Sequence, residues 1–216
     1  MNTQPCDLVI FDCDGVLVET ESLVCRLYVQ MFAEYGYPLE YEETLREHHG
    51  VNLLKRLEHT AQKIGWTPPH SEFLPEFNKR LSDLTERELI VVPGVHSLID
   101  NLTVPICVAS NGSREEITFR LKLSNLTERF GSAIFSGTEV PHPKPAPDVY
   151  LAAAKAFDVH PSRCVVIEDS ILGVTAAVRA GMKVYGHATY NSPESLRKAG
   201  AIPFDNMPEL QAILND

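Results

Sequence analysis

The sequence predicts an α/β protein: a parallel sheet covered by helices on both faces, with a helical segment inserted after the first strand. Three short runs, residues 8–11, 106–109 and 164–167, are apolar almost throughout. Uninterrupted runs of this length are typical of strands buried on both faces. Segments with helical spacing separate the runs, and strands that alternate with helices favour a parallel sheet.

Weaker patterns add the remaining elements of the sheet domain. Residues 133–135 and 183–185 are shorter apolar runs that we expect to form two more strands. Four segments have the length and spacing of helices: residues 95–102, 113–122, 148–157 and 171–180. The first follows the Pro93-Gly94 break, and Gly181 is suited to end the last helix.

One long interval does not fit this alternation. A structureless loop as long as residues 18–90 would be unusual inside a compact domain. The interval instead contains four helical patterns, at residues 22–35, 42–49, 52–64 and 72–86. We therefore expect a sheet domain formed by residues 1–17 and 91–216, and a helical cap domain formed by residues 18–90. Because the insertion leaves the carboxyl end of the first strand, the cap should overhang that edge.

The composition argues against several classes of function. With 44% apolar residues the chain can form a packed core, and no apolar run approaches the about 20 residues that cross a bilayer. The net charge of −10 argues against a nucleic-acid partner, because no basic stripe offsets it. Residues 1–5 carry no secretory pattern, and the five cysteines show no CxxC spacing. We expect a cytoplasmic protein with reduced thiols.

Polar clusters follow the three clearest strands. Asp12-Cys13-Asp14-Gly15 follows the first, Ser110-Asn111-Gly112 the second and Glu168-Asp169-Ser170 the third. Ligands of open parallel sheets bind outside the carboxyl ends of the strands, so these clusters should meet. Four carboxylates in one crevice would repel each other and raise their pKa values. A divalent cation such as Mg²⁺ resolves this conflict, and Lys144 with the Ser-Asn-Gly turn supplies donors for a phosphoryl group.

Each of these residues also has a plainer explanation when it is taken alone. Asp12 could cap a turn, Asp169 could cap the helix that begins at Ile171, and Lys144 could be solvated among its prolines. Only their joint placement favours a site.

The ordered motifs resemble those of the haloacid dehalogenase superfamily, in the phosphatase and β-phosphoglucomutase-like branch with a helical cap. The motifs are Asp12-x-Asp14-Gly15-Val16-Leu17-Val18, Ser110-Asn111-Gly112, Lys144-Pro145 and Glu168-Asp169-Ser170, and the resemblance runs from about residue 7 to residue 187. It implies a Rossmann-like sheet and a Mg²⁺-dependent phosphatase. Such an enzyme would hydrolyse a small phosphorylated metabolite through an aspartyl-phosphate.

The resemblance also implies residue roles. Asp12 would be the nucleophile and Asp14 the general acid and base. The Ser110 hydroxyl would donate a hydrogen bond to the phosphoryl oxygens. Lys144 would form an ion pair with the nucleophile and stabilise the negative charge that develops in the transition state.

Further roles concern the substrate and the metal. Asn111 and Gly112 would bind the phosphoryl group through their amides. The implied metal ligands are Asp12, Asp14 (through its backbone carbonyl), Asp169 and Glu168, the last either directly or through water.

Departures from the family pattern narrow the class of reaction and of substrate that we expect. Dehalogenases lack the second aspartate, so Asp14 argues against carbon–halogen cleavage. The mutases carry a histidine and an arginine in the cap, and this chain has Val24 and Leu53 near those places, which argues against a mutase. A phosphonate hydrolase needs a cap lysine, and neither Lys55 nor Lys63 is in a recognisable setting.

What remains resembles the phosphatases of sugar phosphates and sugar-acid phosphates. The residues that carry this likeness are Val16–Glu21, Gly50-Val51 and Phe135-Ser136-Gly137. We expect a substrate of this class, with 6-phosphogluconate as one candidate. Two alternatives stay open, a β-phosphoglucomutase-type mutase and a catalytically silent binding or regulatory module of the same fold. The sequence does not fix the oligomeric state.

Overall fold

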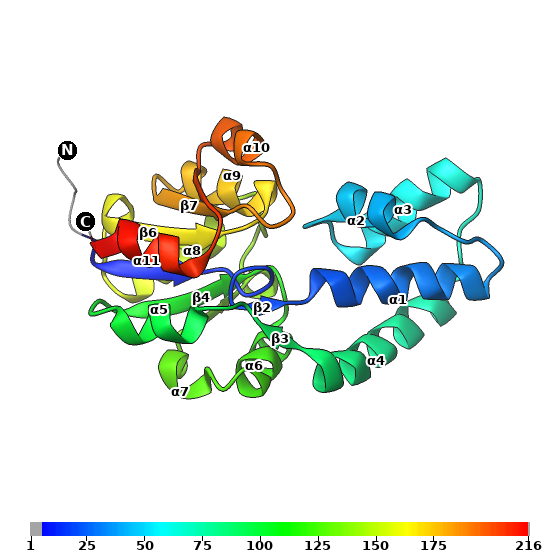
Figure 1. Ribbon diagram of the computed structural model, residues 1–216, viewed down its shortest axis with the longest axis horizontal. Coiled ribbons are helices and arrows are strands. Elements are labelled where there is room, and N and C mark those ends of the chain that lie inside the picture. The colour runs from blue at the N-terminus through cyan, green and yellow to red at the C-terminus, as the bar shows by residue number, and fades with distance from the viewer. Residues whose placement is uncertain (1–5, 216) are drawn as a thin grey trace. The chain divides into compact units, whose positions relative to one another are not determined.

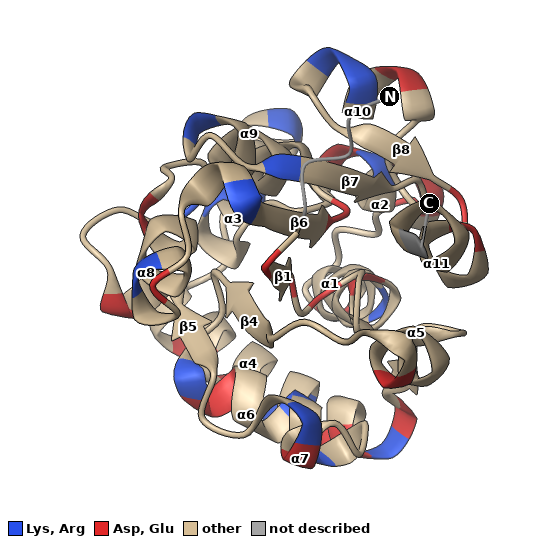
Figure 2. Cartoon of the chain, turned by 90° about the vertical axis from the view of Figure 1, so that its left-hand side faces the viewer, with Lys and Arg blue, Asp and Glu red and all other residues tan. Residues whose placement is uncertain are grey.

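The computed structural model describes residues 6–215. The expectations for residues 1–5 and 216 lie outside this range. In the described part, six strands form one parallel sheet (Figure 1). Their order is β5-β4-β1-β6-β7-β8 (Figure 2). The strands are β1 (Leu8–Phe11), β4 (Ile106–Ser110), β5 (Ile134–Ser136), β6 (Cys164–Glu168), β7 (Lys183–His187) and β8 (Ile202–Phe204). The fold class predicted from the sequence is confirmed.

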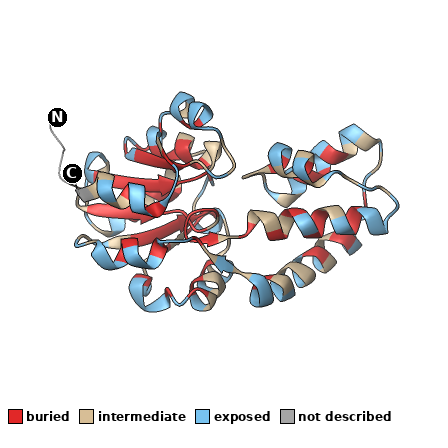
Figure 3. Ribbon diagram, in the orientation of Figure 1, coloured by how far each residue is buried: buried red, intermediate tan, exposed pale blue. Residues whose placement is uncertain are grey.

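β1 lies at the centre of the sheet because its residues can be buried on both faces. Ile10 is paired with Cys107 of β4 on one side and with Val166 of β6 on the other. All residues of β1 and β6 are buried, as the red strands of Figure 3 show. Burying such apolar surface stabilises the fold by about 25 cal/mol per Å². The central strands thereby fix the edge from which the polar motifs project.

Helices cover both faces of the sheet. Figure 2 shows α8 and α9 on one side of the sheet, and α5 and α11 on the other. On the first side, Tyr150 and Ala153 of α8 pack with Val174 of α9 against Leu8 and Ile10. The helices of this unit are α5 (Val95–Asn101), α6 (Arg114–Leu123), α7 (Thr127–Phe130), α8 (Asp148–Ala156), α9 (Ile171–Arg179), α10 (Pro193–Ala199) and α11 (Met207–Asn215), with 3-10 turns η1 (Gly137–Glu139) and η2 (Pro161–Arg163).

Contacts divide the chain into two compact units, one of Met1–Glu19 and Ile90–Asp216 and the other of Thr20–Leu89. The second unit contains α1 (Glu21–Glu34), α2 (Tyr41–His48), α3 (Leu53–Ile64) and α4 (His70–Glu88). Its core is largely aromatic, with Tyr28, Phe32, Phe73 and Phe77 in mutual contact. The sheet unit pairs its two chain connections, β2 (Val18–Glu19) and β3 (Ile90–Val91), as antiparallel strands.

The structure adds elements that the sequence patterns did not predict. β2 and β3 have two residues each and are too short to show a period. Beyond residue 187, α10, β8 and α11 were not predicted. β8 is an edge strand that contains Pro203 and exposes Ile202, so it lacks the apolar pattern of the central strands. In residues 6–215, no helix is long and apolar enough to cross a membrane. All five cysteines are free thiols.

Candidate active site

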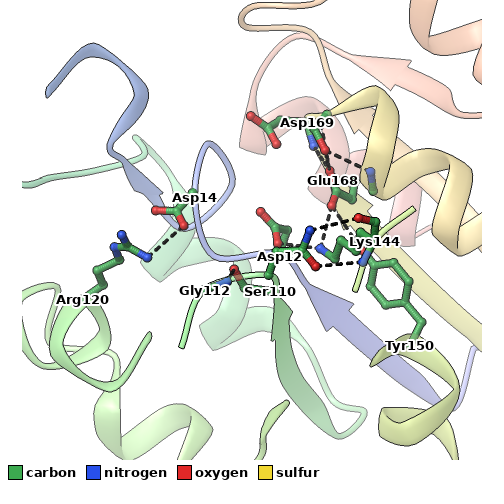
Figure 4. A network of polar contacts seen from close by, with 12 residues as sticks. Asp12, Asp14, Ser110, Gly112, Arg120, Lys144, Tyr150, Glu168 and Asp169 are labelled. Atoms are coloured by element: carbon green, nitrogen blue, oxygen red, sulfur yellow. Dashed lines mark hydrogen bonds and ion pairs between the residues drawn. The ribbon is translucent and has the colours of Figure 1, made fainter. Parts of the chain in front are cut away.

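The loops that follow β1, β4 and β6 meet at the carboxyl edge of the sheet, because these strands are neighbours and run parallel. Ser110 and Glu168 end β4 and β6, and Asp12 directly follows β1. All three residues are buried. Figure 4 shows Lys144, from the loop before α8, pointing into the same place. The structure therefore brings residues of all four motifs together.

The ammonium group of Lys144 lies between two carboxylates. Its Nζ donates to Oδ1 of Asp12 at 2.6 Å and to Oε1 of Glu168 at 2.7 Å, and lies 4.7 Å from the centre of the Tyr150 ring. Only 6% of Lys144 is exposed, so both ion pairs are shielded from water. Asn111 holds the backbone of this lysine: Oδ1 accepts from Lys144 N at 2.8 Å, and Nδ2 donates to Lys144 O at 3.2 Å.

Both oxygens of Glu168 are occupied by donors from the protein. Oε1 accepts from Lys144 and from the Tyr150 hydroxyl, the latter at 3.0 Å. Oε2 accepts from Asp169 N at 2.8 Å and from N and Oγ of Ser170 at 2.8 and 3.0 Å. Because an ionised carboxylate has only about four lone-pair sites, these donors saturate it. A metal bound directly to Glu168 would have to displace one of them.

Asp12, Glu168 and Asp169 form a buried group of carboxylates whose ligand atoms all lie within 4.8 Å of one another. Helix α9 takes its N-cap from Ser170, whose Oγ accepts from Gly173 N at 3.0 Å, so capping does not explain Asp169. Gly15, with φ of 77°, faces Asp169 so closely that a Cβ there would overlap the carboxylate. An all-oxygen set at this spacing fits a hard divalent cation.

The carboxylate of Asp14 is not part of this group. It forms an ion pair with Arg120 of α6, with 3.0 Å between Nη1 and Oδ2 (Figure 4). The side chain of Arg120 is only 12% exposed. The carboxylates of three of the four predicted acidic residues thus lie together, and that of the fourth lies beside a largely buried arginine.

The expected phosphoryl donors lie on the loop after β4. The Ser110 side chain is buried, and its Oγ accepts from Gly112 N at 3.2 Å. The carbonyl oxygen of Gly112 accepts from Ser136 Oγ at 2.6 Å, which ties this loop to the end of β5. The loop is therefore fixed from two sides beside Asp12.

Burial and neighbouring charges shift the pKa values of the site. Burial raises the pKa of Asp12 well above its ordinary value, and Lys144 offsets this only in part. Burial would also raise the pKa of Glu168, but Lys144 and the Ser170 donors outweigh it and lower that pKa. The pKa of Lys144 is raised, because Asp12 and Glu168 outweigh the opposing effect of burial. Glu168 is held ionised, whereas ionised Asp12 needs further positive charge nearby.

The charges around the site favour the same group. The carboxylates of Asp12, Glu168 and Asp169 lie together, and the cation Lys144 pairs with two of them. A divalent cation would offset further negative charge there.

Reasoning from the sequence missed Arg120 and Tyr150. Both stand on helices that were predicted, yet helical spacing alone does not tell which side chain reaches the sheet edge. The available signal was weak: each helix follows a motif loop directly, and each carries a polar side chain that could point back toward it.

A second group of metal-ligand residues lies in the helical unit. Glu47, His48 and His59 have ligand atoms within 4.8 Å of one another. The two imidazoles are already hydrogen-bonded, with 3.1 Å between His48 Nε2 and His59 Nδ1, and Lys63 pairs with Glu47 at 3.2 Å. These contacts explain the group without a metal.

Comparison with known proteins identifies the family. Residues 9–187 match the haloacid dehalogenase-like hydrolases. The chain is 32% identical to 6-phosphogluconate phosphatase of Escherichia coli K12 over 83% of its own length and 81% of that enzyme's. It is 30% identical to a phosphorylated carbohydrates phosphatase of Thermotoga maritima over 97% and 99% of the two chains.

A solved structure shares the whole fold. A family hydrolase of Deinococcus radiodurans R1, crystallised with phosphate and sodium bound, superposes with a TM-score of 0.84 at 31% identity. The superposition covers 97% of this chain and 95% of the other. The chain belongs to the haloacid dehalogenase-like hydrolases. Within that family it is a phosphomonoesterase.

Proposed function

We propose that this chain is a Mg²⁺-dependent phosphatase that transfers a phosphoryl group from a small sugar phosphate or sugar-acid phosphate to Asp12, and then to water. The observation that carries the proposal is the position of Asp12, whose carboxylate is bound by Lys144 at 2.6 Å and grouped with two further buried carboxylates. A carboxylate and a phosphate dianion repel each other, so attack requires the positive charge of Lys144 together with that of a cation held by these carboxylates.

The chain's own residues divide the work as follows. Asp12 attacks phosphorus and receives the phosphoryl group. Lys144 orients that carboxylate and stabilises charge that develops on the phosphoryl oxygens. Ser110 and the Gly112 amide, on the loop beside Asp12, donate hydrogen bonds to the same oxygens. Asp14 protonates the leaving oxygen and then takes a proton from the attacking water.

The metal would be held by Asp12, by Asp169 and, from the resemblance, by the backbone carbonyl of Asp14. Mg²⁺ at this position would offset the negative charge of the phosphate and weaken its repulsion from the nucleophile. Glu168 is already saturated by five donors from the protein. We therefore assign Glu168 to orienting Lys144 and the Asp169–Ser170 backbone, with contact to the metal only through water.

The substrate class rests on the relatives. The two curated enzymes compared above are named for 6-phosphogluconate and for phosphorylated carbohydrates. We propose 6-phosphogluconate as the first substrate to test. The helical unit of Thr20–Leu89 is proposed as the cap that the resemblance implies. A cytoplasmic location stays a prediction from composition.

Phosphate release from 6-phosphogluconate and a panel of sugar phosphates tests the proposal, with Mg²⁺ and with EDTA. Asp12→Asn should abolish release while the protein keeps its fold, because an amide can still accept from Lys144 but cannot attack. Activity retained by this variant would refute the aspartyl-phosphate. Isomerised sugar phosphate without free phosphate would identify a mutase, and no turnover on the panel would identify a binding module.

A thermal melt tests the metal separately from catalysis. Ligands that bind only the native state stabilise it. Mg²⁺ should raise the Tm of the wild type and should have a much smaller effect on Asp169→Asn, because this change removes a ligand from the acidic group. An equal rise in both proteins would place the metal elsewhere.

A further inference from the structure

Arg120 is a nearly buried cation at the site that belongs to none of the four motifs. We propose that Arg120 is a positioning residue, which holds the Asp14 carboxylate beside the loop of Ser110 and Gly112 for its acid and base steps. This assignment rests on the proposed function, because it presupposes the role of Asp14. Figure 4 shows the two side chains pointing toward each other from α6 and the loop after β1.

The helix that carries Arg120 is fixed at its start. Ser113 and Glu116 form a capping box: Glu116 N donates to Ser113 Oγ at 3.3 Å, and Ser113 N donates to Glu116 Oε2 at 2.8 Å. The buried side chains of Ile117 and Leu121 attach the helix to the core. The base of the Arg120 side chain is therefore held in place.

The Arg120 guanidinium lies close to the loop of Ser110 and Gly112, which we expect to bind the phosphoryl group. A Cβ built on Gly112 would lie 3.2 Å from Arg120 Nη1 and 3.6 Å from Ser110 Oγ. A side chain at position 112 would therefore crowd the guanidinium, whereas its distance to the hydroxyl is an ordinary contact. The nitrogen that binds Asp14 thus lies beside the loop that carries this hydroxyl.

Asp14 needs such support because its side chain is 27% exposed. An acid or base must stay within about 2.6 to 3.2 Å of the proton that it transfers, and small misplacements cost large factors in rate. A guanidinium on a fixed helix orients a carboxylate better than water does. The pair should therefore act on the chemical step more than on substrate binding.

The leaving group separates this role from a general loss of structure. An alkyl oxygen must be protonated as it leaves, whereas p-nitrophenolate leaves without help. Arg120→Met should lower kcat/KM for 6-phosphogluconate about 10- to 100-fold. It should change kcat/KM for p-nitrophenyl phosphate less than about 3-fold. The ratio kcat/KM reports the steps up to phosphoryl transfer to Asp12, and with this ester those steps need no proton from Asp14. Arg120→Lys should recover part of the loss. If Arg120→Met does not fold, Arg120→Gln serves as the test variant in its place.

Two controls make the result decisive. Lys122→Met changes an exposed lysine on the same helix and should leave both esters unaffected. In an Asp14→Asn background, Arg120→Met should add less than about 3-fold, because residues that act through one another are not additive. Equal losses on both esters, full additivity, or faster alkyl-ester hydrolysis would overturn the assignment. If the wild type hydrolyses neither ester, the proposed function itself fails, and this role with it.

Discussion

Asn111 forms two hydrogen bonds with the backbone of Lys144, one to N at 2.8 Å and one to O at 3.2 Å. The carboxamide therefore links the second motif to the third. The predicted role for Asn111 was to bind the phosphoryl group through an amide. The side chain instead fixes the loop that presents the lysine, which leaves the backbone amide for that role.

This pair predicts that Asn111→Asp impairs catalysis without touching the reacting atoms. A carboxylate retains an acceptor for Lys144 N but places a second oxygen against Lys144 O, so the loop should shift. We expect kcat to fall about 10- to 100-fold. The free energy of unfolding should fall by about 1 to 3 kcal/mol. Asn101→Asp, an exposed asparagine in α5, is the matched control, and equal kcat values for both variants would contradict the prediction.

Lys144→Met should be the most destabilising change in the site. It leaves Asp12 and Glu168 buried without their common cation, and removing one partner of a buried ion pair costs about 3 to 5 kcal/mol. Urea unfolding without metal should show this loss, together with no measurable turnover. Mg²⁺ should restore more stability to the variant than it adds to the wild type, because it supplies the missing positive charge. A smaller gain than in the wild type would argue against a metal beside Asp12.

Gly173→Ala tests how closely Glu168 is held. Alanine favours a helix over glycine by about 1 kcal/mol, so helix propensity alone predicts a gain in stability. The added Cβ would instead overlap the Glu168 carboxylate and push it away from Lys144. We expect lower stability by about 2 to 4 kcal/mol and reduced phosphate release. Gly181→Ala is the control: its added Cβ meets no atom within 4 Å, and it should cost only the strain of its positive φ.

The site's position was predictable because it depends on strand order rather than on side-chain detail. The apolar runs Leu8–Phe11 and Cys164–Ile167 are each followed directly by an acidic residue, and parallel neighbours bring such ends together. What could not be predicted are contacts between distant segments. The Arg120–Asp14 pair depends on how α6 packs. Two of the five donors to Glu168, the Lys144 ammonium and the Tyr150 hydroxyl, likewise come from distant segments.

The fold shows the same division. Buried central strands have a strong pattern because both faces exclude water, whereas β8, at the edge, includes a proline and exposes Ile202. The fold class could therefore be predicted from the central strands of the sheet. The elements beyond residue 187 could not be predicted in this way.

His48 predicts a pH dependence confined to the helical unit. The residue is 3% exposed, packs against Tyr28 and has no hydrogen-bond partner for Nδ1 among the described residues. Burial lowers its pKa to about 4, and the charges of Arg56 and His59 act in the same direction. In the unfolded chain a histidine titrates near pH 6.5. Between these values the unfolded state binds a proton that the folded state does not.

The stability due to neutral His48 is therefore complete above about pH 6.5 and falls as the pH drops toward 4. The expected loss is about 2 to 3 kcal/mol at pH 4. Trp66, the one tryptophan of the chain, lies in this unit and stacks on Tyr37, so its fluorescence in urea follows the unit directly. His48→Leu should flatten the pH dependence relative to the wild type, since leucine does not titrate. Parallel curves for the two proteins between pH 7 and 4.5 would show that another group is responsible.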